Sequence, residues 1–341
     1  MSASLSSLAF LVPEIHGQPT GGNIYNRRII TELPDEIDTA VIRVGTSPPS
    51  HAPADVILVD SLLARNERVF HSLRSGARDA VIVLVAHYLH CVDPGAEASP
   101  AAETERTLLP LFDGIVTTSA YTKEALTNEG IPERRVAVVP PGLHASYREP
   151  VRGSVHSDSP EVLTVANLIP GKGLPDLIEG LSSLVDVDWS WTLVGDDQLE
   201  PDFADRVRDR LRASPIRDRS SWLGRVPPAD LRARYDRSDI FVLPSHFETC
   251  SMATREAMAR GLPVVAYDVG GLSENVGDTE AGKLVPHTNV EALTAALRPV
   301  LKHASVRERM GDAARRRSET FPSWSDAAAR LRSVLRTWVD G

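Results

Sequence analysis

The chain has few cysteines and no long hydrophobic run. Only Cys91 and Cys250 occur among its 341 residues, so neither a disulfide framework nor a cysteine-based metal site is expected. No apolar segment approaches the ~20 residues that a membrane-spanning helix needs. The amino terminus also has no cationic stretch before its first apolar run, which argues against a signal peptide. We therefore expect a soluble, cytoplasmic protein.

The chain also lacks an excess of basic residues. Its 37 lysines and arginines are outnumbered by 46 aspartates and glutamates, which gives a net charge of −9. A nucleic-acid partner needs a dense basic face, so this charge argues against one. Nearly all the basic residues are arginines, and the only lysines are Lys123, Lys172, Lys283 and Lys302. A lysine in a glycine-flanked loop is therefore conspicuous.

Short apolar runs alternate with helical patterns along the whole chain. Strands are expected at 8–12, 40–44, 56–59, 81–85, 114–117, 136–139, 162–165, 190–194, 240–243, 264–266 and 283–285. Helices are expected at 23–33, 62–75, 104–112, 121–129, 174–184, 202–213, 229–238, 251–260, 290–303 and 307–320. Continuous Val, Ile and Leu strands separated by helices predict an α/β fold with parallel sheets covered on both faces.

A polar segment rich in Ser and Pro divides the chain. Residues 147–160 show no helix or strand periodicity and are expected to link a domain over 1–146 to a second over 161–320. Each domain is expected to be a doubly wound, Rossmann-like sheet, and such sheets bind ligands at the carboxyl ends of their strands. Residues 321–341 predict an amphipathic C-terminal helix. Its apolar stripe consists of Trp324, Ala328, Leu331, Leu335 and Trp338.

The most informative segment contains two glutamates between two buried strands. An apolar run ends at Pro244, the next loop carries Glu248, and the next helix carries Glu256. Met252, Glu256 and Ala259 share one face of that helix, so Glu256 is predicted to point in an apolar direction. Burying a carboxylate is costly unless a donor reaches it. One interpretation is that a neighbouring amide or arginine donates to Glu256. The other is that a ligand hydroxyl donates to it, with Glu248 as a second acceptor in the loop.

This segment resembles the retaining GT-B glycosyltransferases of family 4. The resemblance combines a strand ending in Pro-Ser, the E-x7-E spacing, the run Glu-Ala-Met-Ala, and Gly-Leu-Pro-Val-Val-Ala at 261–266. It implies two Rossmann-like domains facing across a cleft, with the C-terminal helix crossing back to the first domain. The alternative is that this helix packs on its own domain. In the family the first glutamate, here Glu248, contacts the donor sugar, and the second, here Glu256, holds the ribose hydroxyls of the nucleotide.

The loop between the two glutamates follows from the same resemblance. Thr249, Cys250 and Ser251 are expected to line the donor, and many relatives have glycine where Ser251 stands. The Ser251 hydroxyl offers an additional hydrogen bond. This departure concerns the identity of the donor sugar rather than the class of reaction.

A second motif places a lysine between two glycines after the strand at 162–165. Gly171 and Gly173 allow close approach of the backbone, and the helix that follows offers an N-terminus that favours an anion. Lys172 adds a full positive charge there, although a solvated lysine in a turn is the simpler alternative. The resemblance implies that Gly171 and Lys172 bind the donor diphosphate. Relatives often have arginine at the position of Asn167, so we expect diphosphate binding to depend more on Lys172 or on another cation.

The first domain contributes a glycine pair and a histidine. Gly21 and Gly22 begin a helix whose free amides are available to a phosphate, although a bare Gly-Gly is most often only a helix start. His87 lies at the carboxyl end of a buried strand, with His90 as the weaker candidate; the alternative is a histidine satisfied by its neighbours. The resemblance implies that the glycine pair closes over the diphosphate and acceptor, and that His87 lies near the donor sugar.

Two further segments match the family. Gly195 follows the strand at 190–194, and the run Leu-Gly-Arg-Val at 223–226 includes Arg225 and Val226. The resemblance implies that the second run lies beside the nucleobase and reads its edge with backbone groups. A plain turn before the next helix explains it equally well.

Several other signals are absent. The chain has no G-x-x-x-x-G-K-[ST] P-loop and no Gly-x-Ser-x-Gly elbow. Asp186-Val-Asp188 is interpreted as the polar start of a strand, so no metal site is expected.

The resemblance therefore implies a hexosyltransferase that moves a sugar from a nucleotide-diphosphate sugar to an acceptor hydroxyl. Glu248, Lys172 and His87 are the expected catalytic residues. The reaction is expected to be retaining, front-face and metal-independent, with no cofactor beyond the donor, and a UDP-sugar is favoured over GDP-mannose. The alternatives are another GT-B enzyme, such as a phosphorylase or a nucleotide-sugar epimerase, or a module that binds a nucleotide sugar without turnover.

The acceptor and the oligomeric state stay open. A sugar, a lipid or a small molecule all fit as acceptor, and both a monomer and a homodimer fit the sequence. The first domain has a net charge of about −6 by residue count, which weakens the case for peripheral contact with an anionic membrane without excluding it.

Overall fold

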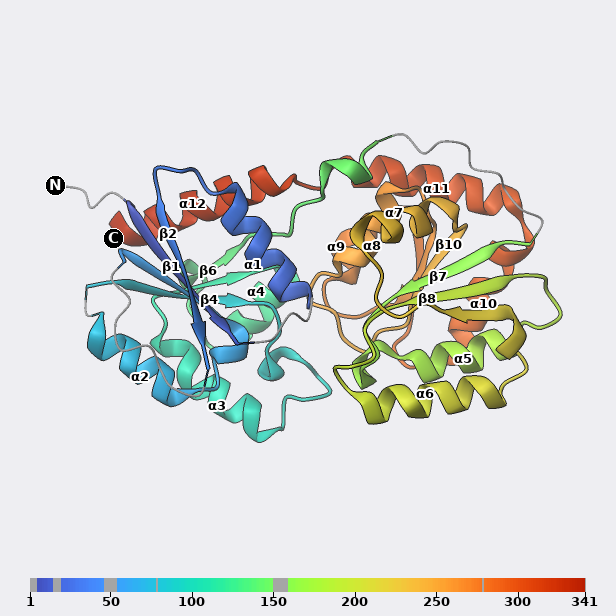
Figure 1. The fold of residues 1–341 in the computed structure, drawn as a ribbon, viewed down its shortest axis with the longest axis horizontal. Coiled ribbons are helices and arrows are strands. Elements are labelled where there is room, and N and C mark those ends of the chain that lie inside the picture. The colour runs from blue at the N-terminus through green and yellow to red at the C-terminus, as the bar shows by residue number, and fades with distance from the viewer. Residues whose placement is uncertain are drawn as a thin grey trace. The chain divides into compact units, whose positions relative to one another are not determined.

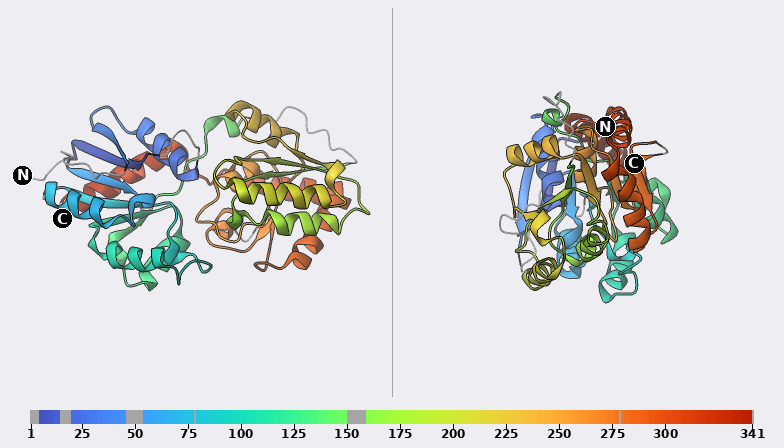
Figure 2. Two further views of the ribbon diagram at one scale, coloured as in Figure 1. Left: turned by 60° about the horizontal axis from the view of Figure 1, so that its bottom comes forward. Right: turned by 90° about the vertical axis from the view of Figure 1, so that its right-hand side faces the viewer.

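The chain forms two compact units. The computed structural model describes residues 5–14, 20–45, 54–77, 79–149, 159–277 and 279–340. The N-terminal unit comprises residues up to Gly142 together with the segment from Pro322 onward, and the C-terminal unit comprises Leu143–Phe321. Each unit contains a six-stranded parallel sheet with helices around it (Figure 1 and Figure 2), which confirms the predicted α/β fold. Residues 150–158 of the predicted linker lie outside the described residues.

The sheet of the N-terminal unit has the strand order β2-β1-β3-β4-β5-β6. Its strands are β1 Ser7–Pro13, β2 Asp38–Val44, β3 Val56–Asp60, β4 Val81–Ala86, β5 Gly114–Thr117 and β6 Val136–Val138. The central strands are apolar, apart from Asp60 at the end of β3, because both of their faces are covered. Helix α1 (Gly21–Glu32) lies on one face, and α2 (Glu67–Gly76) and α3 (Pro100–Leu108) lie on the other (Figure 1).

Capping residues set where these helices begin, and two of the observed helix starts differ from those that the hydrophobic periodicity predicted. The Asn66 side chain accepts a hydrogen bond from the Val69 amide, so α2 begins after Asn66 rather than at residue 62. Ser99 caps α3 in the same way, which starts that helix earlier than predicted. A 3-10 turn that contains Pro110 follows Leu108, because proline has no amide hydrogen to continue the helix. Helix α4 (Ala120–Asn128) lies within one residue of its predicted bounds.

The C-terminal helix α12 (Trp324–Asp340) belongs to the N-terminal unit, where it packs on α1. The rings of Tyr25 on α1 and Trp324 meet edge to face, 5.8 Å apart. Two glycines make room for the helix. A Cβ atom at Gly142 would lie 2.3 Å from the Trp324 nitrogen, and one at Gly114 would lie 2.6 Å from the Trp338 ring. These contacts exclude the alternative that the helix packs on the second domain.

The C-terminal unit has a second sheet with the order β12-β11-β10-β7-β8-β9. Its strands are β7 Glu161–Val165, β8 Ser190–Val194, β9 Ser220–Trp222, β10 Ile240–Leu243, β11 Val264–Tyr267 and β12 Gly282–Val285. Strand β9 was not predicted, because this edge strand has three residues, two of them serine, and shows no apolar period.

Helices cover both faces of this second sheet (Figure 1). They are α5 Leu174–Ser182, α6 Pro201–Ala213, α7 Pro228–Arg237, α8 Met252–Ala259, α9 Leu272–Val276, α10 Val290–Lys302 and α11 Ala304–Ser318. The short α9 was not predicted. None of the helices in the described ranges has both the length and the hydrophobicity that crossing a bilayer requires.

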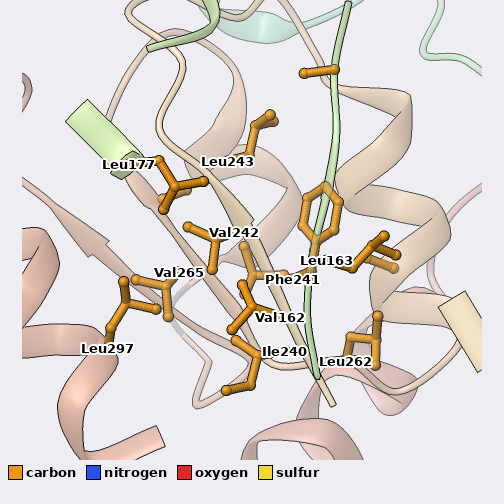
Figure 3. Close-up of a cluster of buried hydrophobic side chains, with 14 of the residues drawn as sticks. Val162, Leu163, Leu177, Ile240, Phe241, Val242, Leu243, Leu262, Val265 and Leu297 are labelled. Carbon is orange, nitrogen blue, oxygen red and sulfur yellow. The ribbon is translucent and has the colours of Figure 1, made fainter. Parts of the chain in front are cut away.

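Side chains of the middle strands alternate between two buried layers. Val242 points toward Leu177 of α5 and Leu297 of α10, whereas Phe241 points to the opposite face with Leu163 (Figure 3). All five side chains are buried. Because both faces of the sheet are filled, the strands are held rigidly, and the loops that follow them start from defined positions.

Candidate functional site

In the C-terminal unit the predicted site residues follow the strands at one edge of the sheet. All six strands are parallel, so their carboxyl ends meet at that edge. Asn167 and Lys172 come after β7, Gly195 after β8, residues 224–226 after β9, and Glu248 after β10. Open α/β sheets bind their ligands at such an edge.

Lys172 and Glu248 form an ion pair at this edge. The Lys172 Nζ atom lies 2.6 Å from Glu248 Oε1, and the Ser245 hydroxyl donates to the same oxygen at 2.8 Å. The Lys172 side chain is 24% exposed and that of Glu248 10% exposed, so the cation is the more accessible partner. The sequence identified each residue separately and did not predict the pair or the part of Ser245.

Backbone contacts hold the two loops of this pair together. The His246 amide donates to the Gly171 carbonyl at 2.9 Å. Gly173 has a φ of 60°, and a Cβ atom there would lie 1.8 Å from the Pro244 carbonyl oxygen. Only glycine fits at this position, so Gly173 lets the Lys172 loop approach the Glu248 loop. Gly171 is exposed, and an added Cβ atom there meets nothing within 4 Å.

A second glycine pair, which the sequence analysis missed, holds the backbone of Glu248. The Gly271 amide donates to the Glu248 carbonyl at 2.8 Å. Gly270 has a φ of 53°, and a Cβ atom there would lie 1.9 Å from the same carbonyl oxygen. The signal was available in the sequence, because Gly270-Gly271 follows the buried strand β11.

Asn167 and Gly195 join the loops after β7 and β8. A Cβ atom at Gly195 would lie 1.8 Å from the Ala166 carbonyl oxygen, and the Gly195 amide donates to Gly224 at 3.0 Å. Asn167 Oδ1 accepts a hydrogen bond from the Asp196 amide at 3.2 Å. The Asn167 side chain therefore braces the neighbouring loop and places no cation at its position.

The run that contains Arg225 and Val226 forms a turn between β9 and α7. Gly224 has a φ of 63°, which glycine adopts without strain. Arg225 is exposed, whereas Val226 is half-buried against the core of the unit. This run therefore forms the turn that was the simpler alternative, and it also exposes Arg225 at the edge of the sheet where the ligand site is expected.

Glu256 is half-buried on α8 and is held by tyrosines. The Tyr235 hydroxyl donates to Glu256 Oε2 at 3.0 Å, and the Tyr147 hydroxyl also hydrogen-bonds Glu256. Burial, and after it the charge of Glu256, raises the pKa of both tyrosines, so both hydroxyls stay protonated as donors. The predicted partner of the carboxylate was an amide, an arginine or a ligand. The protein instead supplies phenol groups from elements that precede α8.

The predicted buried face of α8 needs a correction. Met252, Glu256 and Ala259 are only half-buried. The buried residues of the helix are Thr254, Arg255, Ala257 and Met258. Glu256 therefore points along the margin of the helix, where a carboxylate keeps partial contact with solvent.

The loop between the two glutamates ends in an unusual backbone conformation. Ser251 is the N-cap of α8 and has a φ of 53°, in the region that favours glycine. Its hydroxyl accepts a hydrogen bond from the Thr254 amide at 3.4 Å. A glycine at this position would adopt the same φ without strain. Cys250 is buried, and burial raises the pKa of its thiol to about 11.

In the N-terminal unit the structure brings Gly22 and His87 together. His87 follows β4 directly, and Gly21 and Gly22 are the first residues of α1. A Cβ atom at Gly22 would lie 2.8 Å from the His87 ring. His87 Nε2 donates to Asn26 Oδ1 at 2.7 Å, and Asn26 in turn donates to Asp60 at 2.6 Å. His87 is thus part of a buried polar network beneath the start of α1.

His90 has a different environment. Its Nδ1 atom lies 3.1 Å from Oε1 of Glu105, a buried carboxylate on α3. The other oxygen of Glu105 accepts the Cys91 amide at 3.0 Å. Within the described residues, His90 is thus tied to α3 rather than to the Gly22 helix start.

The burial of His87 predicts a pH-dependent stability. Burial lowers the pKa of His87 below its ordinary value of about 6.5, although the nearby Asp60 opposes this. Below pH ~6.5 the unfolded chain therefore binds more protons than the folded one. The contribution of His87 is complete above that pH and is lost as the pH falls through the lower, folded-state pKa. Urea unfolding between pH 7.5 and 5 should show a steeper loss of stability for the wild type than for His87→Gln.

An exposed histidine provides the control for this prediction. His303 lies at the surface before α11, so His303→Gln should keep the wild-type pH dependence. Parallel curves for the wild type and His87→Gln would contradict the assignment.

Part of the chain matches the model of a known protein family. Residues 149–317 match the model of the family described as "Glycosyl transferases group 1". Among curated proteins, the chain is 31% identical over 224 residues to an MMP alpha-(1->4)-mannosyltransferase from Mycolicibacterium hassiacum, covering 64% of this chain and 53% of that protein. It is also 31% identical over 214 residues to a D-inositol 3-phosphate glycosyltransferase from Corynebacterium glutamicum, covering 59% and 51%. The chain spans about half the length of these relatives.

Solved structures share the fold over nearly the full chain. Sucrose-phosphate synthase from Thermosynechococcus elongatus superposes with a TM-score of 0.79 at 22% identity, covering 97% of this chain and 98% of that one. Anabaena HepE, crystallised with UDP and glucose, superposes with a TM-score of 0.81 at 18% identity, covering 97% and 99%.

Proposed function

We propose, because residues 149–317 belong to the glycosyl transferases group 1, that this protein transfers a sugar from a nucleotide-diphosphate sugar to an acceptor hydroxyl. The chain has the GT-B fold of such enzymes, with one parallel sheet in each unit. One observation carries the proposal: a half-buried ammonium group and a carboxylate are paired at the carboxyl edge of the second sheet, inside the matched segment.

Charge explains why this pair suits a nucleotide-sugar donor. Without a ligand, Lys172 and Glu248 compensate each other at 2.6 Å. A diphosphate adds negative charge that Lys172 can bind, and the sugar adds hydroxyls that can donate to Glu248. The diphosphate would thus replace Glu248 as the partner of Lys172, and the sugar hydroxyls would replace Lys172 as the partner of Glu248. We propose that Lys172, with the backbone around Gly171, binds the diphosphate and that Glu248 binds the sugar.

The remaining roles follow the position of each group. Glu256, oriented by two tyrosine donors, is proposed to hold the ribose hydroxyls. Residues 249–251, with Gly195, Arg225 and Val226, are proposed to line the rest of the donor, and Asn167 to act through the loop that it braces. In the N-terminal unit, Gly21, Gly22 and His87 are proposed to serve the diphosphate and the reacting sugar.

The proposed reaction is retaining and front-face. As the leaving diphosphate gains charge, Lys172 and helix amides stabilise it, and this electrostatic stabilisation is the main catalytic contribution. A phosphate oxygen of the donor accepts the proton of the acceptor hydroxyl, so no general base is assigned. We propose that no metal ion takes part. UDP-sugars are the favoured donors, in line with the UDP in the HepE structure.

A thermal-shift screen against UDP, GDP, ADP and their sugars tests this proposal. A ligand at 100 times its dissociation constant adds about 2.7 kcal/mol of stability. We therefore expect an increase of several degrees in the melting temperature with the UDP ligands. Nucleotide release should follow from the sugar that gives the largest shift, with and without EDTA. No shift with any nucleotide would contradict donor binding, and a shift without release would favour the non-catalytic module.

A further inference from the structure

The side chain of Asn275 is completely buried and lies beside the loop between the two glutamates. Asn275 belongs to the short helix α9 and has a relative exposure of 0%. Its Nδ2 atom donates to the carbonyl of Cys250 and, at 3.2 Å, to that of Ser251. A buried side-chain amide needs such partners, since leaving it unpaired costs about 1–3 kcal/mol. Here both of its donors go to consecutive backbone carbonyls.

Those two carbonyls flank the most unusual backbone position of the loop. Ser251 has φ 53° and ψ 88°, and together with Thr288 it is one of two non-glycine residues with positive φ in the described ranges. Such a conformation costs a non-glycine residue about 1–3 kcal/mol and persists only when its surroundings enforce it. The hydrogen bonds from Asn275 hold the carbonyl side of Ser251, and Thr254 binds its hydroxyl at 2.9 Å.

Two arginines hold Asn275, one at its side-chain amide and one at its backbone carbonyl. Arg255 Nε donates to Asn275 Oδ1 at 2.7 Å, so the opposite end of the amide must be the nitrogen. Arg317 donates from Nε to the Asn275 carbonyl at 3.0 Å and also binds the carbonyl of Glu274. Both guanidinium groups lie over the ring of Phe321. Asn275 is therefore held from its side chain and from its backbone.

We propose that Asn275 is a positioning residue for the donor-binding loop 249–251. Its carboxamide holds Ser251 in the conformation that glycine would adopt unaided, and so fixes the loop that joins Glu248 to α8. The ligand class is the nucleoside diphosphate of the donor, which this loop is proposed to line. This proposal rests on the proposed function, because it assigns a role within the same donor site.

Asn275→Ala and Ser251→Gly, alone and combined, test this role. Asn275→Ala should weaken UDP binding about tenfold, as expected for a lost set of buried hydrogen bonds. Ser251→Gly alone gives the reference affinity for a loop that lacks the serine hydroxyl but adopts positive φ without support. The double variant should recover most of the lost affinity, because glycine adopts positive φ without support. Calorimetry gives the dissociation constants.

Two further variants complete the design. Asn275→Asp keeps the shape of the side chain and the acceptor for Arg255 but loses the two donated hydrogen bonds. It should therefore weaken UDP binding at least as much as Asn275→Ala does. It also tests the role if the alanine variant does not fold. Asn289 caps α10 by accepting the Ala292 amide at 2.8 Å, and Asn289→Ala should lower stability without changing UDP affinity. This is the result expected for an asparagine that contributes to stability alone, and Asn275 is compared with it.

The outcomes separate this proposal from the proposed function. If the wild type binds no nucleotide, the donor site itself is refuted. The double-mutant cycle in unfolding free energy needs no ligand, and it should still show coupling between positions 251 and 275. Additive effects on stability, an unchanged affinity in Asn275→Asp, or no recovery in the double variant would overturn the role of Asn275.

Discussion

Replacing Lys172 with alanine should lower turnover about 10²- to 10³-fold, the effect of removing one preorganised donor to a developing negative charge. The free energy of unfolding should change much less. Lys172 is 24% exposed, so water screens its charge and reduces what the ion pair contributes to stability. Glu248, moreover, keeps the Ser245 hydroxyl as a donor when the lysine is removed.

Lys283 provides a matched control for this experiment. It is an exposed lysine of β12 in the same unit, so Lys283→Ala removes the same charge away from the Glu248 loop. Turnover is measured as nucleotide release from the preferred donor, and stability by urea unfolding. Equal activity of Lys172→Ala and Lys283→Ala would remove Lys172 from the site.

Replacing Glu256 with alanine should weaken nucleotide binding by roughly 1–3 kcal/mol, the range for lost buried hydrogen bonds. The reason is geometric, because two tyrosine donors already orient the carboxylate toward one position. Glu256→Gln keeps the size of the side chain but lowers its strength as an acceptor, so an intermediate loss is expected.

Pyrophosphate separates the roles of Glu256 and Lys172. Pyrophosphate has no ribose, so Glu256→Ala should weaken UDP binding while leaving pyrophosphate binding unchanged, whereas Lys172→Ala should weaken both. Glu291, exposed in the first turn of α10, is a suitable control position. Unchanged UDP affinity in Glu256→Ala would count against the ribose role.

The regular elements were predictable because their signals are local. The strands β5 and β8 have the bounds that the apolar runs predicted. Helix starts were less accurate, since a single capping side chain such as Asn66 moves the start by several residues. The elements β9 and α9 were missed because three and five residues are too few to show a period.

The sequence alone was enough to identify the residue types that a nucleotide-sugar site requires, because glutamates at fixed spacing and a glycine-flanked lysine can be recognised within one short segment. Their partners could not be identified in this way. Ser245 lies within three residues of Glu248, but Lys172 lies 76 residues away, and Tyr235 lies 21 residues before Glu256. A parallel sheet brings the ends of distant strands to one edge, and contacts of about 3 Å there depend on how the whole core packs. The folded chain alone therefore decides that the ammonium group meets Glu248, that tyrosines hold Glu256, and that Asn275 holds the strained serine.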